Sequence, residues 1–202
     1  MIKAVARAGV LMCVLLAGCA NIATLPTASM PPAQAVAAID LGGRLSVRYQ
    51  RDGQEEALHG SFSWSQRAGR TLVTLMSPLG QTLATIDITP TEAVLTQSGQ
   101  PARSATDPDA LAADALGWPL PVAGLRDWLQ GHAKDASGKS VTASPDNTNS
   151  ILTSDGWTLQ YASWEASDMT KPVRPKRIDL SRSTSAAGNV TIRIIIDSWQ
   201  PV

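Results

Sequence analysis

Two histidines, His59 and His132, are the side chains best suited to act as a general base near neutral pH. Hydrolysis or acyl transfer would also need a serine, threonine or cysteine nucleophile beside one of them. His59 lies on the polar side of an alternating run, and His132 directly follows Gly131 at a predicted helix end. Neither has a nucleophile or carboxylate at a recognisable spacing, and the chain contains no G-x-S-x-G, H-E-x-x-H or P-loop motif. We therefore expect both histidines to be structural and the protein not to be an enzyme.

Three aspartates, Asp107, Asp109 and Asp114, form the other group that could do acid–base chemistry. Asp107 precedes Pro108, which is the arrangement of a helix N-cap followed by proline at the first helical position. We interpret all three as helix-cap and surface charges. The sequence predicts no metal site and no cofactor.

Cys19 is the residue whose surroundings point most directly to covalent chemistry. A basic N-terminus and a short apolar run, 10–17, precede Leu16-Ala17-Gly18-Cys19. This pattern resembles a bacterial lipoprotein signal, which implies removal of residues 1–18 and acylation of Cys19. The alternative is an ordinary secretory signal in which the cysteine has no special role. Several acyl chains on one residue make a stable membrane anchor. Ala20, in place of aspartate, implies sorting to the outer membrane with the protein facing the periplasm.

Composition narrows the class of partner. Lys+Arg and Asp+Glu both number 17, so the net charge is zero. Zero net charge argues against a nucleic-acid binder and against attraction to anionic lipid by charge alone. After removal of the signal, Cys19 is the one remaining cysteine, so we expect no disulfide within the chain. We expect the protein to be a monomer.

The chain divides into a tether and one domain. Residues 19–38 are rich in Pro, Ala, Ser and Thr and predict a flexible lipidated tether, although residues 32–40 could hold a short helix. Residues 39–202 predict a single domain. Apolar residues alternate with polar ones in runs 41–49, 58–64, 71–76, 82–88, 92–96, 157–164, 177–180 and 190–199, with a short strand at 151–152.

Two short helices are expected in the middle of the chain, at 109–116 and about 122–130. The segment 132–149 is polar and predicts a loop or edge hairpin. About nine or more antiparallel strands with two helices predict a mainly β fold with some α, because a twisted sheet of that size curls. We expect a curved antiparallel sheet, an incomplete half-open barrel, whose apolar concavity is capped by the helices and is either filled by side chains or holds a ligand.

The turn Ser77-Pro78-Leu79-Gly80-Gln81 joins two of the predicted strands. Proline followed two residues later by glycine is typical of a turn, but its tip carries leucine where turns are normally polar. From the residues alone, Leu79 either folds back on the core or presents an apolar side chain to something outside the protein.

Six tryptophans leave a similar choice between core packing and the lining of an apolar pocket. Trp118 lies in a proline-flanked linker, 117–121, that either hinges a lid or forms a packed corner.

Four stretches together resemble the LolB family: 60–64 (Gly-Ser-Phe-Ser-Trp), 77–80 (Ser-Pro-Leu-Gly), 116–129, and 196–199 (Ile-Asp-Ser-Trp). Their order and spacing across most of residues 41–199, together with the lipoprotein signal, are fairly specific, while 132–149 carries no match. The resemblance implies a half-barrel with a hydrophobic cavity. It also implies a receptor that accepts lipoproteins from a periplasmic LolA-like carrier, binds their acyl chains and inserts them into the outer membrane.

The resemblance implies roles for individual residues. Leu79, flanked by Pro78 and Gly80, corresponds to the exposed leucine needed to release cargo into the membrane. The candidates for the acyl-chain cavity are the apolar residues on inward-facing positions of the strands and helices: Val47, Phe62, Trp64, Leu75, Ile86, Leu111, Leu116, Leu125, Trp128, Leu129, Trp157, Leu159, Ile178 and Ile194.

Two alternatives belong to other classes of protein. The first is a lipoprotein scaffold or assembly factor that binds partners at its sheet edge without binding lipid. The second is a hydrolase of envelope lipids, which would depend on His59 or His132.

Overall fold

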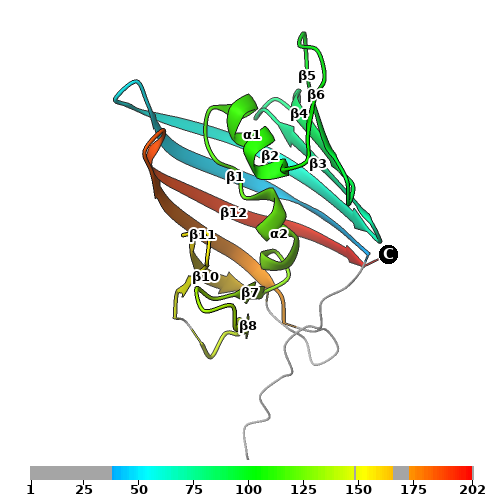
Figure 1. Ribbon diagram of the computed structural model, residues 1–202. Coiled ribbons are helices and arrows are strands. Elements are labelled where there is room, and N and C mark those ends of the chain that lie inside the picture. The colour runs from blue at the N-terminus through cyan, green and yellow to red at the C-terminus, as the bar shows by residue number, and fades with distance from the viewer. Residues whose placement is uncertain (1–37, 148, 166–172, 202) are drawn as a thin grey trace, which may run out of the picture.

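A computed structural model describes residues 38–147, 149–165 and 173–201 of the chain. Within these residues the dominant feature is one antiparallel sheet of ten strands, in the order β6-β5-β4-β3-β2-β1-β12-β11-β10-β9. Figure 1 shows the sheet curving around two short helices that lie across one of its faces. The two ends of the sheet, β6 and β9, do not pair with one another, so the sheet forms an open half-barrel rather than a closed one.

The described strands follow the chain as two groups separated by the helices. The first group is β1 (Ile39–Arg51), β2 (Gln54–Arg67), β3 (Arg70–Met76), β4 (Thr82–Ile88), β5 (Ala93–Gln97) and β6 (Arg103–Ala105), and the second is β9 (Ile151–Leu152), β10 (Thr158–Trp164), β11 (Pro175–Thr184) and β12 (Gly188–Pro201). A separate two-stranded hairpin, β7 (His132–Lys134) with β8 (Ser140–Thr142), lies between them in sequence.

The alternation in the sequence determines which face of the sheet is buried. In β12, Val190, Ile192, Ile194 and Ile196 are all buried, while Arg193 between them is exposed. A period of two places alternate side chains on opposite faces, so each strand contributes one apolar row to the inner face and one polar row to the outer face.

The first and last long strands meet in the centre of the sheet. Leu45 of β1 lies opposite Ile194 of β12 on one side and Gly60 of β2 on the other. This pairing joins the two strand groups into one sheet, and the two helices between the groups lie across its inner face (Figure 1).

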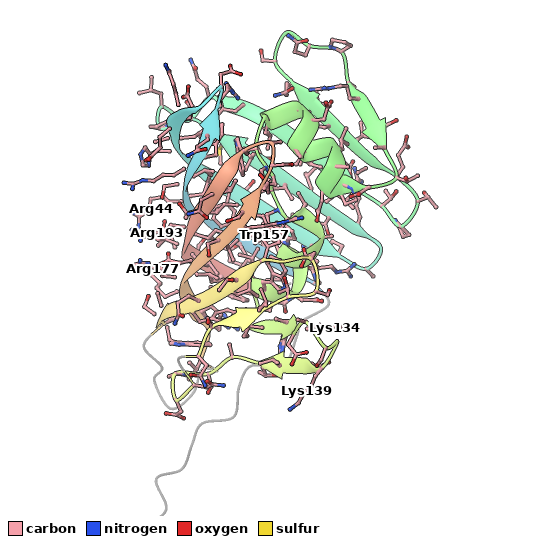
Figure 2. All side chains as sticks on the ribbon, turned by 60° about the vertical axis from the view of Figure 1, so that its left-hand side comes forward. Arg44, Lys134, Lys139, Trp157, Arg177 and Arg193 are labelled. Carbon is pink, nitrogen blue, oxygen red and sulfur yellow. The ribbon has the colours of Figure 1, made fainter. Side chains whose placement is uncertain are left out.

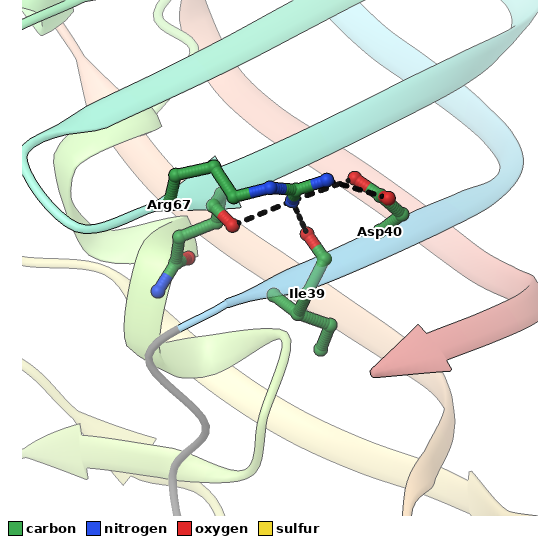
Figure 3. Close-up of polar contacts among 4 residues, drawn as sticks. Ile39, Asp40 and Arg67 are labelled. Carbon is green, nitrogen blue, oxygen red and sulfur yellow. Dashed lines mark hydrogen bonds and ion pairs between the residues drawn. The ribbon is translucent and has the colours of Figure 1, made fainter. Parts of the chain in front are cut away.

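The start of β1 is fixed to the end of β2 by Arg67. Its guanidinium donates to both carboxylate oxygens of Asp40 at 2.9 Å and to the carbonyl oxygen of Ile39 at 3.4 Å (Figure 3). A bidentate arginine–carboxylate pair sets orientation as well as distance. These contacts fix Ile39 and Asp40, the first residues of β1, to the end of β2.

Helix α1 (Pro108–Leu116) begins and ends as the sequence predicts. The Asp107 carboxylate accepts hydrogen bonds from the backbone N–H groups of Asp109 and Ala110, at 2.9 and 3.2 Å. Gly117 ends the helix in the left-handed conformation, with φ of 80°, which an L side chain adopts with strain. Helix α2 (Val122–Trp128) ends two residues earlier than predicted.

The fold differs from the sequence prediction in a few places. Strand β6 was not predicted, because three residues carry too little alternation. Strands β2 and β11 are longer than expected, since their ends extend beyond the apolar core, and Pro175 begins β11 instead of belonging to a loop. Ile39 and Asp40 lie in β1, so the short helix suggested by the sequence for residues 32–40 does not include these two residues. Residues 32–37 lie outside the described part of the chain.

Candidate functional site

The turn between β3 and β4 is closed by its own hydrogen bonds. The Ser77 N–H donates to the Gln81 carbonyl at 2.8 Å, and the Gly80 N–H donates to the Ser77 carbonyl at 2.9 Å. Gly80 has φ of 80°, a conformation in which an L side chain is strained. These constraints make the turn a defined structure whose tip is Leu79.

Leu79 points away from the protein, with 88% of its surface exposed. The other large apolar side chains that are exposed among the described residues are covered much more, Leu152 being 53% exposed and Leu83 40% exposed. Of the two directions that the sequence left open for Leu79, the outward one is therefore observed. Pro78 and Gly80 flank it in the turn, as the sequence requires.

Leu83 adds apolar surface to the same hairpin. Leu75 pairs with Ala84 and Met76 pairs with Thr82, which leaves Leu83 as the extra residue of a β-bulge. Leu83 was not among the predicted site residues, although the inward alignment of Ala84 and Ile86 places it on the opposite face of β4.

The inner face of the sheet encloses a small apolar cavity of ≈ 20 Å³ beneath α2. A volume of about 10–15 Å³ holds one water molecule, so this cavity as it stands cannot hold an acyl chain. Six of the predicted residues line it: Phe62, Trp64, Leu75, Leu125, Leu129 and Ile194. Leu45, Val73, Leu120 and Ile192 also line it, and sequence reasoning did not select these four.

The other predicted cavity residues pack around the cavity without lining it. Leu116 is partly buried, and the remaining seven are buried in the same apolar cluster: Val47, Ile86, Leu111, Trp128, Trp157, Leu159 and Ile178. They were selected because they are apolar and face inward. Apolar periodicity predicts which side chains are buried, but not how close each one lies to this cavity. Their role as acyl contacts stays a prediction.

Helix α2 is held in place by polar contacts at both ends. Its N-cap residue, Pro121, supplies no capping side chain; instead the Asp109 carboxylate of α1 accepts a hydrogen bond from the Ala123 N–H at 2.9 Å. At the other end the Tyr161 hydroxyl of β10 donates to the Trp128 carbonyl at 2.9 Å. These contacts link α2 to α1 and to the sheet.

Burial affects the acid–base behaviour of both contact residues. Loss of solvent around the half-buried Asp109 raises the pKa of its carboxyl above its usual value, and the hydrogen bond from Ala123 opposes that rise. Burial also raises the pKa of the Tyr161 hydroxyl, which therefore stays protonated and able to donate at physiological pH.

The linker between the helices is a packed corner. Trp118 is buried, and its ring lies 6.4 Å from that of Tyr49 on β1, measured between ring centroids. Leu120 is also buried and lines the cavity. Of the two interpretations of this linker, the structure therefore supports the packed corner.

The histidines are far from any arrangement typical of a hydrolase. His59 is exposed on the outer face of β2, whereas His132 lies on the separate β7–β8 hairpin. The His132 Nδ1 lies 3.4 Å from the Thr142 hydroxyl, and its buried Nε2 has no hydrogen-bond partner among the described residues. The described residues also contain no cluster of three metal-ligating side chains.

A comparison with protein-family models matches residues 37–199 to the family described as "Outer membrane lipoprotein LolB". The chain belongs to the LolB family. A protein named Outer-membrane lipoprotein LolB from Cupriavidus necator is 39% identical over 187 residues, covering 93% of this chain and 92% of the relative. The protein of the same name from Thiobacillus denitrificans is 38% identical over 185 residues, covering 92% and 91%.

The family assignment confirms the resemblance found in the sequence, and it places the chain among outer-membrane lipoproteins of the lipoprotein localisation pathway. LolB is not a known family of enzymes. A solved structure described as a LolA superfamily protein from Nitrosomonas europaea superposes with a TM-score of 0.44 and 8% identity, covering 85% of this chain and 88% of the other. In the described residues no helix has the length and apolar character needed to cross a bilayer.

Proposed function

We propose that this protein accepts lipoproteins from a periplasmic carrier, holds their acyl chains between α2 and the inner face of the sheet, and inserts them into the outer membrane. The observation that carries the proposal is the pairing of an apolar interior with a rigid turn whose leucine is 88% exposed. In this mechanism the interior shields the acyl chains and the turn contacts the bilayer.

Acyl binding requires the interior to open. The cavity of ≈ 20 Å³ is closed on one side by Leu120, Leu125 and Leu129 and on the other by the sheet. An acyl chain would therefore displace α2 and its neighbouring linker. Outside the carrier, each CH₂ group that the interior shields from water contributes about 0.8 kcal/mol, whereas breaking a hydrogen bond such as the one from Tyr161 costs about 1 kcal/mol.

We propose that Leu79 enters the bilayer while the acylated Cys19 anchors the chain, Cys19 itself lying outside the described residues. Gln66 of β2 pairs with Ile39 on one side and with Thr71, near the start of β3, on the other. The β3–β4 turn follows Met76 at the end of β3, so Ile39 and the turn lie at opposite ends of that strand. The seven residues of β3 span roughly 23 Å. The chain from Cys19 to Ile39 can span at most about 70 Å, so the anchor and the turn can both reach one membrane.

The scaffold alternative has less support from the sheet edges. The edge strand β6 has three residues and the edge strand β9 has two. Short edge strands offer few unpaired backbone groups for another chain to pair with. A protein that recruits partners by adding strands would be expected to present a longer edge.

The test is transfer of a lipoprotein from a loaded periplasmic carrier to liposomes by the wild type and by Leu79→Glu. We expect the variant to accept cargo from the carrier but to insert it poorly, because a carboxylate at the tip opposes entry into hydrocarbon. Unchanged insertion would show that the turn does not act in the membrane. Failure to take up any acylated cargo in the wild type would overturn the receptor function itself.

A further inference from the structure

A groove on the outer face of the sheet lies beside the turn that carries Leu79. Its volume is ≈ 510 Å³, and it is lined by Arg44, His59, Ser61 and Arg193, with Pro78 of the turn at its border. Leu45 and Ile195 also line it. The groove is therefore continuous with the turn, since Pro78 directly precedes Leu79.

Strand register brings these polar side chains together from three strands. Ser46 of β1 lies opposite His59 of β2 and opposite Arg193 of β12, while Arg44 lies opposite Ser61 and Ile195. Figure 2 shows Arg44, Arg193 and Arg177 one above another along the same side of the sheet, pointing away from the helices. The residues thus form one surface, although Arg44 and Arg193 are far apart in sequence.

The surface carries more positive than negative charge. It consists of Arg44, Arg48, Lys176, Arg177 and Arg193, with Asp179 and Asp197, and we name these residues the outer basic cluster. Five cations and two carboxylates give a net charge of +3. The chain as a whole has no net charge, so the cluster is a local concentration of positive charge.

The two arginines in the groove retain hydrogen-bond donors for a ligand. Arg44 uses Nε and one hydrogen of Nη2 on the Asp197 carboxylate, at 2.8 and 2.9 Å, and Arg193 uses Nε on Asp179 at 3.0 Å. A guanidinium has five N–H donors, so these contacts leave several on each arginine. Their side chains are 63% and 53% exposed, so a ligand can reach those donors.

We propose that this groove binds the phosphate of an anionic phospholipid headgroup in the bilayer that the Leu79 turn enters. The proposal rests on the membrane role of the turn given above. Arginine guanidinium groups match phosphate oxygens in charge and geometry. A headgroup layer covers the hydrocarbon into which Leu79 would insert, so a groove bordered by Pro78 lies at the depth where phosphates are found.

The proximity of the turn favours a lipid phosphate over an acidic protein surface. A protein partner would have to dock on the same side as Leu79 and would compete with the membrane for it. A headgroup in the groove and a leucine in the hydrocarbon instead act together on one bilayer, which predicts that each strengthens the other.

The experiment measures vesicle binding by the mature chain from residue 19, carrying Cys19→Ser so that it is not acylated. Two vesicle types are compared, phosphatidylcholine alone and phosphatidylcholine with phosphatidylglycerol. We expect phosphatidylglycerol to strengthen binding at low salt, and Arg193→Gln to remove about fivefold of that gain. Asp179 also pairs with Arg177, so we expect the variant to keep its fold.

Arg70→Gln is the matched control. The Arg70 side chain is 63% exposed, against 53% for Arg193, and it likewise pairs with one aspartate, Asp87, but it lies at the far end of β3 from the turn. We expect this variant to keep the full gain from phosphatidylglycerol.

Equal losses in the Arg193 and Arg70 variants would overturn the proposal, because the effect would then follow overall charge. Weaker transfer from the carrier by Arg193→Gln, with unchanged vesicle binding, would assign the groove to a protein partner and also overturn it. Binding to phosphatidylcholine that does not depend on Leu79 would instead count against the membrane role of the turn. The two failures are therefore distinguishable.

Discussion

The exposed leucine at the tip of the β3–β4 turn allows a quantitative prediction. Leu79→Ala removes three carbon atoms from a side chain that is 88% exposed. At about 0.8 kcal/mol for each carbon buried, the membrane-bound state should lose about 2 kcal/mol, or roughly thirtyfold in binding to vesicles. The free energy of unfolding should change by less than about 0.5 kcal/mol, because the side chain contributes little to the core.

The measurement compares binding to phosphatidylcholine vesicles by the unacylated mature chain and its variants. Leu152→Ala is the matched control, because Leu152 is 53% exposed but lies on β9, at the other end of the sheet from β4. We expect Leu79→Ala to bind much more weakly and Leu152→Ala to bind as the wild type does. Urea unfolding of both variants checks that stability is unchanged.

Equal effects of the two substitutions would refute the reasoning, because the contact would then be a general property of exposed leucines. A loss well below tenfold for Leu79→Ala would show that the side chain does not leave water when the protein meets the bilayer. A large loss of stability in Leu79→Ala would show that the turn supports the fold instead.

Three further predictions concern the interior and the polar contacts. Leu125→Ala should lower the free energy of unfolding by about 3 kcal/mol in urea, and a long-chain fatty acid should restore part of it by filling the enlarged cavity. Asp109→Asn keeps an acceptor for the Ala123 N–H but removes a charge whose pKa is raised by burial. The folded wild type holds the Asp109 proton to higher pH than the unfolded chain, so its stability should fall with rising pH across that range, and the asparagine variant should not show this fall. The hydrogen bond from Arg67 lowers the pKa of Asp40 in the folded protein. The pair should therefore stabilise the fold above the usual pKa of aspartate and lose this effect as pH falls through the lowered pKa. In Arg67→Gln the free energy of unfolding should depend less on pH across this acidic range.

Local features of the fold follow from the sequence with little ambiguity. The alternation in residues 41–49 and 190–199 predicted which side chains of β1 and β12 are buried, because a strand places every second side chain on the same face. Asp107-Pro108 and Gly117 predicted the ends of α1 for an equally local reason, since caps depend on neighbouring backbone groups. Residues 77–81 predicted the turn in the same way.

The sequence alone left the direction of Leu79 and the size of the interior undecided. Whether a turn residue is covered depends on what packs beside it, and nothing local to 77–81 specifies that. The cavity of ≈ 20 Å³ is the space left between side chains from β1, β2, β3, β12, α2 and the helix linker. Its volume depends on all their relative positions, so apolar periodicity could not separate the residues that line it from the buried residues packed around them.

The charge of the chain shows the difference between sequence and tertiary structure most clearly. From composition, a net charge of zero argued against attraction to anionic lipid by charge alone. Pairing of β1 with β12 and of β12 with β11 nevertheless gathers Arg44, Arg193 and Arg177 on one outer surface. The sequence determined the strands, their buried faces and the apolar turn, because those depend on neighbours along the chain. Only the tertiary structure decided the closed cavity and the outer basic cluster, because both depend on register between strands that are distant in sequence.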